Sequence, residues 1–97
     1  MLNSRQRAQL RGLANPIETI FQVGKGGVTE NLVRQVDDAL LARELIKLRV
    51  LETAPEGVRP VAEALAAATG ADVVQVIGSR CVLYRPHPDE PQIRLVR

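Results

Sequence analysis

The sequence predicts an α/β two-layer sandwich, because segments with helical periodicity alternate with short strand-like segments. Their order along the chain is helix, strand, helix, strand, helix, strand, strand. The chain has 97 residues, of which 45% are hydrophobic, and this size suits one domain with one modest core. Crossover connections between parallel strands are right-handed. If the strands progress outward in one direction, we therefore expect the two crossover helices to cover the same side of the sheet.

The first predicted elements are a helix and a short strand. Asn3 or Ser4 can cap a helix that runs to about Ala14. Pro16 then ends this helix, because the residue before a proline avoids helical backbone angles. The β-branched and aromatic content of residues 19–23 indicates a strand.

The next two elements show the clearest periodicity. Thr29 is placed to cap a helix over residues 30–42. The apolar positions of this helix recur at helical spacing: Leu32, Val33, Val36 and Leu40. Residues 44–52 form the clearest strand, in which apolar side chains alternate with Lys47 and Arg49. One face of this strand is therefore expected in the core and the other in solvent.

The last part of the chain is predicted to add a helix and a hairpin. These elements are a helix over residues 58–69, a strand over 72–77, a turn at Gly78 and Ser79, and a strand over 80–85. Three prolines follow within a short mixed-charge segment. We expect one domain over residues 1–86 and a proline-rich tail over 87–97, with a short strand at 93–96.

Charge is distributed unevenly along the chain, although the net charge is only +2. Residues 1–25 carry a balance of +3, residues 26–79 a balance of −3, and residues 80–97 a balance of +2. If the two basic ends meet in the fold, they would form one patch that attracts a polyanion. Ordinary solvated charge is the alternative that composition leaves open.

The residue inventory argues against several functional classes. Cys81 is the only cysteine, so no intramolecular disulfide can form, which fits a reducing compartment. No apolar stretch is long enough to span a bilayer, and Arg5, Arg7 and Arg11 interrupt any secretory signal. His87 has no partner at metal-ligand spacing, and no catalytic triad or acid–base pair can be assembled. We expect a cytoplasmic, non-catalytic protein without a metal, cofactor, membrane contact or small-molecule substrate.

Residues 23–30 read V-G-K-G-G-V-T-E, which places three glycines around Lys25 between a predicted strand and a predicted helix. Helix N-termini attract anions, and glycine lets a phosphate approach the backbone. The order matches neither a P-loop nor the dinucleotide fingerprint, because Lys25 precedes the last glycine and Glu30 stands where that fingerprint needs glycine. On spacing alone, a phosphate site and a plain turn both stay open.

Four separated motifs occur in a recognisable order: residues 23–30, E-L-I-K at 44–47, Q-V-I-G at 75–78 and V-L-Y-R-P at 82–86. With them, residues 2–86 resemble the CRM domain, the RNA-binding domain of chloroplast splicing and ribosome-maturation factors and of free-standing bacterial YhbY proteins. The resemblance implies a fold similar to the C-terminal domain of translation initiation factor three, with a mixed four-stranded sheet and helices on one side. It also implies a GxxG loop that holds RNA, and association with precursors of the large ribosomal subunit.

The resemblance places the RNA-binding loop at residues 24–27 and matches basic residues of the first helix to positions that are usually basic in the family. The expected RNA-binding residues are Gly24, Lys25, Gly26, Gly27, Arg5, Arg7, Arg11, Lys47, Arg49 and Arg85. For the helix arginines and for Lys47 and Arg49, an ordinary solvated face is the alternative. Arg85 could instead cap the edge of the sheet.

Aromatic residues limit how RNA could be recognised. Phe21 and Tyr84 are the only aromatic residues, and two rings cannot form the stacking platform of several rings by which RRM and OB-fold proteins read bases. Tyr84 could stack on a base, although packing with Val82 explains it as well. A protein–protein adaptor is the alternative function, in which the acidic stretch 30–72 and the open sheet face bind a partner protein.

Overall fold

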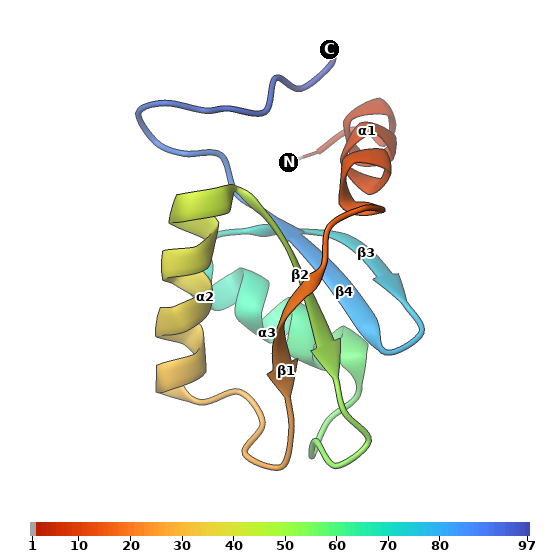
Figure 1. Cartoon of the computed structure of the whole chain (residues 1–97), viewed down its shortest axis with the longest axis vertical. Coiled ribbons are helices and arrows are strands. Elements are labelled where there is room, and N and C mark those ends of the chain that lie inside the picture. The colour runs from red at the N-terminus through yellow and green to blue at the C-terminus, as the bar shows by residue number, and fades with distance from the viewer. Residues whose placement is uncertain (1) are drawn as a thin grey trace.

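The computed structural model describes residues 2–97 and is shown in Figure 1. The helices are α1 (Ser4–Ala14), α2 (Glu30–Arg43) and α3 (Val58–Thr69). The strands are β1 (Thr19–Val23), β2 (Leu45–Val50), β3 (Asp72–Ile77) and β4 (Arg80–Tyr84). The helices and strands predicted before the tail are all present, in the predicted order. Within residues 2–97, no helix has the length and apolar content that crossing a membrane requires.

The strands form one mixed sheet in the spatial order β1-β2-β4-β3. β1 and β2 are parallel, whereas β4 is antiparallel to both β2 and β3. β4 follows β3 through a tight turn and inserts beside β2, so the last strand becomes a central strand. The mixed four-stranded sheet implied by the family resemblance is confirmed.

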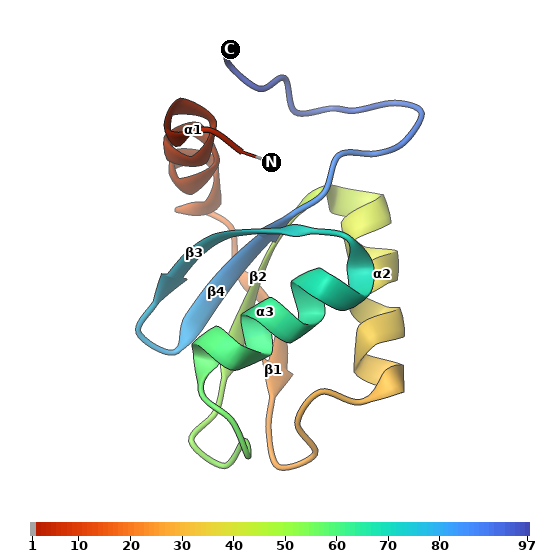
Figure 2. The same cartoon turned by 180° about the vertical axis from the view of Figure 1, so that it is seen from behind.

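The first hydrophobic core lies between the sheet and helices α2 and α3. The alternation predicted for β2 directs Ile46, Leu48 and Val50 into this core. The helices contribute these buried residues: Val36, Leu40, Val61, Ala62, Leu65 and Ala66. Figure 2 shows α3 lying across this face of the sheet. The expectation that the two crossover helices share one side is therefore confirmed.

The expectation that all helices pack on one side is wrong for α1. Leu10 and Ala14 of α1 pack with Leu45, Val82 and Tyr84, whose side chains leave the sheet on the opposite face. The alternate residues of β4 are apolar on this face as well as on the first, so the sheet offers a second apolar area. The helix α1 covers it and makes a second, smaller core.

The tail, residues 87–97, forms neither a helix nor a strand, so the strand expected at 93–96 is wrong. The tail turns over the C-terminal end of α2 and runs back toward α1 (Figure 1). Ile93 and Leu95 pack against the second core. Backbone groups of the tail bond to side chains of α1 instead of to a neighbouring strand, which is why no strand forms.

Candidate nucleic-acid interface

The loop between β1 and α2, residues 24–27 and here called the GKGG loop, is a tight turn. The N–H of Gly27 donates to the carbonyl of Gly24 at 2.9 Å, which closes a four-residue turn. Gly27 has a φ of 64°, and a Cβ atom there would lie 2.9 Å from Cγ of Pro55. The fold therefore requires glycine at position 27.

The other two glycines of the loop have no comparable structural reason. An added Cβ at Gly24 would make an ordinary contact at 3.6 Å with Leu51, and one at Gly26 would meet nothing closer than 3.9 Å. Neither glycine has a positive φ. Lys25 and Gly26 are both exposed. Because the fold would accept a side chain at Gly26, the glycine there leaves the backbone accessible to a partner.

The loop also leaves backbone donors available. Within residues 2–97, the N–H groups of Lys25, Gly26 and Val28 donate no hydrogen bond to another protein group. A hollow of about 240 Å³ lies between the loop, the end of β1 and the first turn of α2. Three side-chain amides line it: Gln22, Asn31 and Gln35. This hollow can therefore offer neutral donors to an oxygen-rich ligand beside the Lys25 ammonium.

The start of α2 contributes less to anion binding than the sequence indicated. The hydroxyl of Thr29 accepts a hydrogen bond from the N–H of Leu32 at 3.1 Å, so one helix-terminal donor is already satisfied. Glu30 adds a carboxylate to the first turn, where it interacts favourably with the helix dipole and repels a phosphate. The available donors are therefore those of the loop.

A row of polar side chains continues from the loop across the sheet. The strand register aligns Gln22 with Arg49, and Arg49 with Arg80. Alternation along the strands puts Arg49 on the face of Leu45 and Arg80 on the face of Val82, which is the face that α1 covers at its other end. We call Gln22, Arg49 and Arg80 the open row, because no helix of the described chain covers this part of the face (Figure 1).

The two arginines of the open row have no ion-pair partner within residues 2–97. Arg49 and Arg80 lie directly opposite each other on antiparallel strands, and both are exposed. Within residues 2–97, neither forms an ion pair with a carboxylate. Like charges in directly opposed positions destabilise a sheet. A bound phosphate between the two guanidinium groups would remove this repulsion.

Other basic residues among those predicted lie either on the sheet or on α1. Lys47 lies on the same face as the open row, and its Nζ is 3.5 Å from the carbonyl of Asn15 at the end of α1. Arg5 and Arg11 are exposed on α1. Lys47 and Arg49 therefore lie on one face of the sheet, Lys25 lies in the loop that follows β1, and the α1 arginines lie farther along the molecule.

Arg7 was expected to bind RNA, but its guanidinium has hydrogen-bond partners inside the protein. Nη1 of Arg7 donates to the carbonyls of Val73 and Val74. The register of β3 shifts between Val73 and Gln75, so this irregularity leaves carbonyls that Arg7 can satisfy. Arg7 therefore holds α1 against β3, and we leave it out of the proposed interface.

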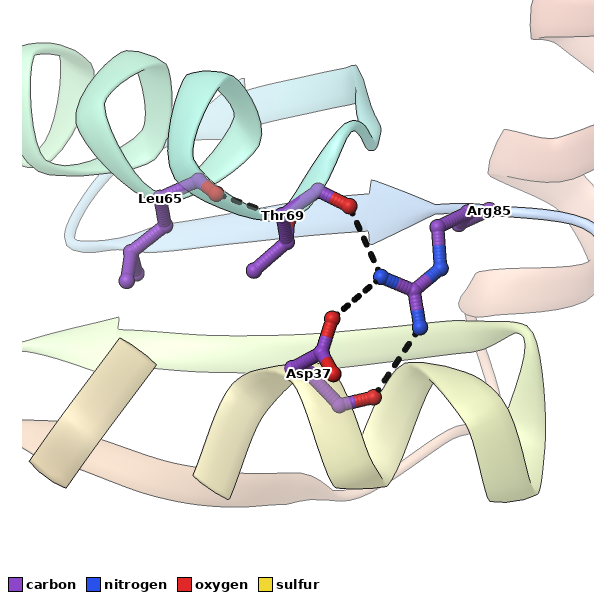
Figure 3. Close-up of polar contacts among 4 residues, drawn as sticks. All are labelled: Asp37, Leu65, Thr69 and Arg85. Atoms are coloured by element: carbon purple, nitrogen blue, oxygen red, sulfur yellow. Dashed lines mark hydrogen bonds and ion pairs between the residues drawn. The ribbon is translucent and has the colours of Figure 1, made fainter. Parts of the chain in front are cut away.

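Arg85 also has internal partners, as Figure 3 shows. Its Nη1 lies 2.5 Å from Oδ1 of Asp37 and donates to the carbonyl of Thr69 at 2.7 Å. Its Nη2 donates to the carbonyl of Asp37 at 3.1 Å. Arg85 therefore connects α2 to the C-terminal end of α3, which is closer to the alternative of a structural cap than to an RNA contact.

Arg80 is the site residue that the sequence analysis missed. It stands at the start of a predicted strand, but its neighbour Arg49 is 31 positions earlier, and only the β2–β4 register brings the two together. Tyr84 is buried, so packing with Val82 explains it and base stacking does not. Burial raises the pKa of the Cys81 thiol to about 11, which fits an unreactive core residue.

Comparisons with known proteins identify the family of this chain. The family model of the CRS1/YhbY (CRM) domain matches residues 2–85. The Bacillus subtilis (strain 168) protein "Probable RNA-binding protein YqeI" is 45% identical over 98% of this chain and 99% of its own length. A Haemophilus influenzae protein named "RNA-binding protein" is 35% identical over 99% of this chain and 96% of its own length.

A solved structure gives the same result for the fold. The solution structure of the hypothetical protein SAV1595 from Staphylococcus aureus superposes with a TM-score of 0.82 and 46% sequence identity. It covers 99% of this chain, and this chain covers all of it. The match therefore spans nearly the whole length of both chains. By sequence and by structure, the chain belongs to the CRS1/YhbY (CRM) domain family.

Proposed function

We propose that this chain is a non-catalytic RNA-binding protein that grips an RNA backbone with the GKGG loop and the open row. The loop amides and the Lys25 ammonium take one phosphate, and Arg49 and Arg80 take another. Contacts of this kind position a nucleic acid and do not read its sequence. The names of the relatives support RNA as the ligand.

One observation carries the proposal: Arg49 and Arg80 form no ion pair within residues 2–97, and Arg49 is aligned with Gln22, just before a loop with unbonded amides and a glycine that the fold does not need. Each feature has an ordinary explanation when taken alone. Together they support a surface that offers cations, neutral donors and an accessible backbone to one ligand. A polyanion with regularly spaced phosphates uses all three at once.

Binding of single-stranded RNA at a series of salt concentrations tests this proposal. Each lost phosphate contact lowers the steepness of the log–log salt dependence by about 0.7. Lys25→Glu, Gly26→Asp and Arg49→Gln should each lower the steepness and weaken binding by about 10-fold or more, because charge-assisted hydrogen bonds are lost. Arg59→Gln is the matched control, since Arg59 is exposed on α3, which packs on the opposite face.

The outcomes distinguish binding at the proposed site from unspecific attraction by the net charge of the protein. The proposal expects Arg59→Gln to bind as the unmodified protein does while the loop and row variants weaken. Equal losses in all four variants would indicate general electrostatics and reject the proposed site. Circular dichroism and urea denaturation check that the variants are folded.

We also propose that the natural ligand is ribosomal RNA in precursors of the large subunit. This part of the proposal rests on the resemblance to the free-standing bacterial members of the family. Crosslinking in cells, followed by sequencing of the attached RNA, tests it. Enrichment of large-subunit sequences supports this target. Crosslinks confined to other RNAs would reject the target but not the proposed phosphate-binding site.

A further inference from the structure

The tail brings two arginines next to α1. The side chain of Gln9 donates to the carbonyl of Arg94 at 2.8 Å and accepts from the N–H of Val96 at 2.9 Å. Gln6 donates to the carbonyl of Val96 at 2.9 Å. One Gln9 amide therefore pairs with the tail backbone as a neighbouring strand would. The basic N-terminal and C-terminal segments, which the sequence left apart, meet at this point.

The tail directs its cations outward. Ile93 and Leu95 pack against the second core, whereas Arg94 and Arg97 are exposed. Arg5 lies one helical turn before Gln9 on the same side of α1, so it belongs to the same surface. The end patch consists of Arg5, Arg94 and Arg97, and within residues 2–97 none of them pairs with a carboxylate.

Glu44, a residue with an unfavourable backbone conformation, holds the tail in this position. Glu44 joins α2 directly to β2 with a φ of 66°, which is unfavourable for a residue other than glycine. Its buried carboxylate accepts from the N–H groups of His87 and Gln92 at 2.8 Å and of Ile93 at 3.0 Å. Burial alone would raise the pKa of the Glu44 carboxyl, but these hydrogen bonds and the nearby His87 lower it below its ordinary value. The anchor is therefore a charged, fully bonded carboxylate.

Basic residues connect the end patch with the proposed site. Lys47 reaches the carbonyl of Asn15 at the C-terminal end of α1, and Arg11 is exposed one turn earlier on that helix. The molecule is 38 Å long, and the GKGG loop and the tail lie at opposite ends of this axis (Figure 1). An RNA strand that runs along the open face would meet cations from one end to the other.

We propose that Arg94 and Arg97, held beside Arg5 by the Glu44 anchor, form a second phosphate-binding area for the same RNA. This inference rests on the RNA-binding function proposed above. The capping box of α1 already satisfies the start of that helix, so the attraction comes from the arginine side chains. The tail thus lengthens the RNA footprint beyond the loop and the open row.

The double variant Arg94→Gln/Arg97→Gln tests the proposal in binding to a single-stranded RNA of about 15 nucleotides, a length within the site sizes known for single domains. Loss of two phosphate contacts should lower the steepness of the log–log salt dependence by about 1.4. Arg59→Gln, with its charge on the opposite layer, should leave the salt dependence unchanged. Lys25→Glu is measured in parallel to monitor the loop.

Two further variants test whether the docked position matters and not only the charge. Gln9→Ala and Glu44→Gln keep both tail arginines but weaken their attachment to the fold. Affinity should then fall in proportion to the docked fraction of the tail. Amide chemical shifts of Ile93 and Leu95 report that fraction directly, and urea denaturation confirms that the domain is folded.

The possible results separate this inference from the proposed function. If Lys25→Glu weakens binding and Arg94→Gln/Arg97→Gln does not, the end patch is rejected and the loop site stands. If neither variant changes binding, the proposed function fails as well. If the double variant weakens binding but undocking the tail has no effect, the arginines act as diffuse charge and the docked patch is rejected.

Discussion

The two ends of β4 each carry an arginine, and the protein uses these arginines in opposite ways. Arg85 follows the strand and bonds to Asp37 and Thr69, so its guanidinium interacts with other groups of the protein (Figure 3). Arg80 begins the strand, is exposed, and faces Arg49 with no ion pair in the described chain. One end of β4 is a closed polar junction, and the other is an open cationic surface.

This difference shows that charge alone does not identify binding residues. Both are arginines at an end of one predicted strand, yet RNA binding was predicted for Arg85 and not for Arg80. The closed end stabilises the fold, because both terminal nitrogens of the Arg85 guanidinium have acceptors there. At the open end, the unpaired and opposed arginines do not stabilise the described fold. Local arrangements that are unfavourable for stability are expected at functional sites.

The strongest test of the closed end is Arg85→Ala. This variant should lose about 2 kcal/mol of unfolding free energy, because charge-assisted hydrogen bonds to Asp37 and Thr69 disappear. Asp37 is half exposed, so its carboxylate can be rehydrated and the loss stays moderate. Urea denaturation measures the change, with Arg59→Ala as the control. RNA affinity of the folded variant should be unchanged, and a specific loss of affinity would contradict the assignment of Arg85 to the fold.

The stability that Glu44 contributes near the closed end should depend on pH. Its folded pKa lies below the ordinary value of 4.5, so its stabilisation is present above pH 4.5 and is lost as the pH falls through the folded pKa. Glu44→Gln should cost about 2 kcal/mol at neutral pH, since one tail N–H loses its acceptor. The difference between the two proteins should shrink below pH 4.5 in denaturation experiments. A difference that stays constant down to acid pH would contradict the role of the charged carboxylate.

The GKGG loop contains a similar contrast, because the fold needs one of its glycines and not another. Gly27→Ala should cost about 1–2 kcal/mol, because its positive φ and the close contact with Pro55 both oppose a side chain. Gly26→Ala should leave stability within about 0.5 kcal/mol, because the site has room, yet it should weaken RNA binding. Thermal denaturation and RNA titration of both variants check this pair. Equal RNA affinity of Gly26→Ala and the unmodified protein would show that the glycine is not needed for close approach.

The smallest expected effect has the opposite sign. Arg80→Gln removes the repulsion with Arg49 and should raise the unfolding free energy by about 0.5 kcal/mol at low salt. The gain should vanish at high salt, because exposed charges are then screened. RNA affinity should fall at the same time. A variant that is both less stable and unimpaired in RNA binding would mean that Arg80 belongs to the fold, as Arg85 does.

The sequence predicted most of the fold because local patterns determine most of it. Alternation in β2 and helical spacing in α2 identified the residues of the first core, such as Leu48 and Leu40. The position of α1 could not be predicted in this way. Leu10 and Ala14 define an apolar side of that helix, but the choice between two apolar faces of a sheet depends on the arrangement of all four strands.

The candidate site was predictable only in part, for a related reason. The GKGG loop is contiguous, so its chemistry is visible in eight residues. The partners of Arg7 and Arg85 and the neighbour of Arg80 come from distant segments. Glu44 combines a positive φ with acceptance from amides more than 40 positions away, and no local pattern indicates either property.

A titration of ¹⁵N-labelled protein with single-stranded RNA, followed by amide chemical shifts, tests the central claim most directly. The account predicts that the largest shifts occur at Lys25, Gly26 and Val28, followed by Arg49 and Arg80. The amide of Arg85 and those of α3 should move little. If the loop amides keep their shifts when RNA saturates the protein, the phosphate-binding loop does not exist.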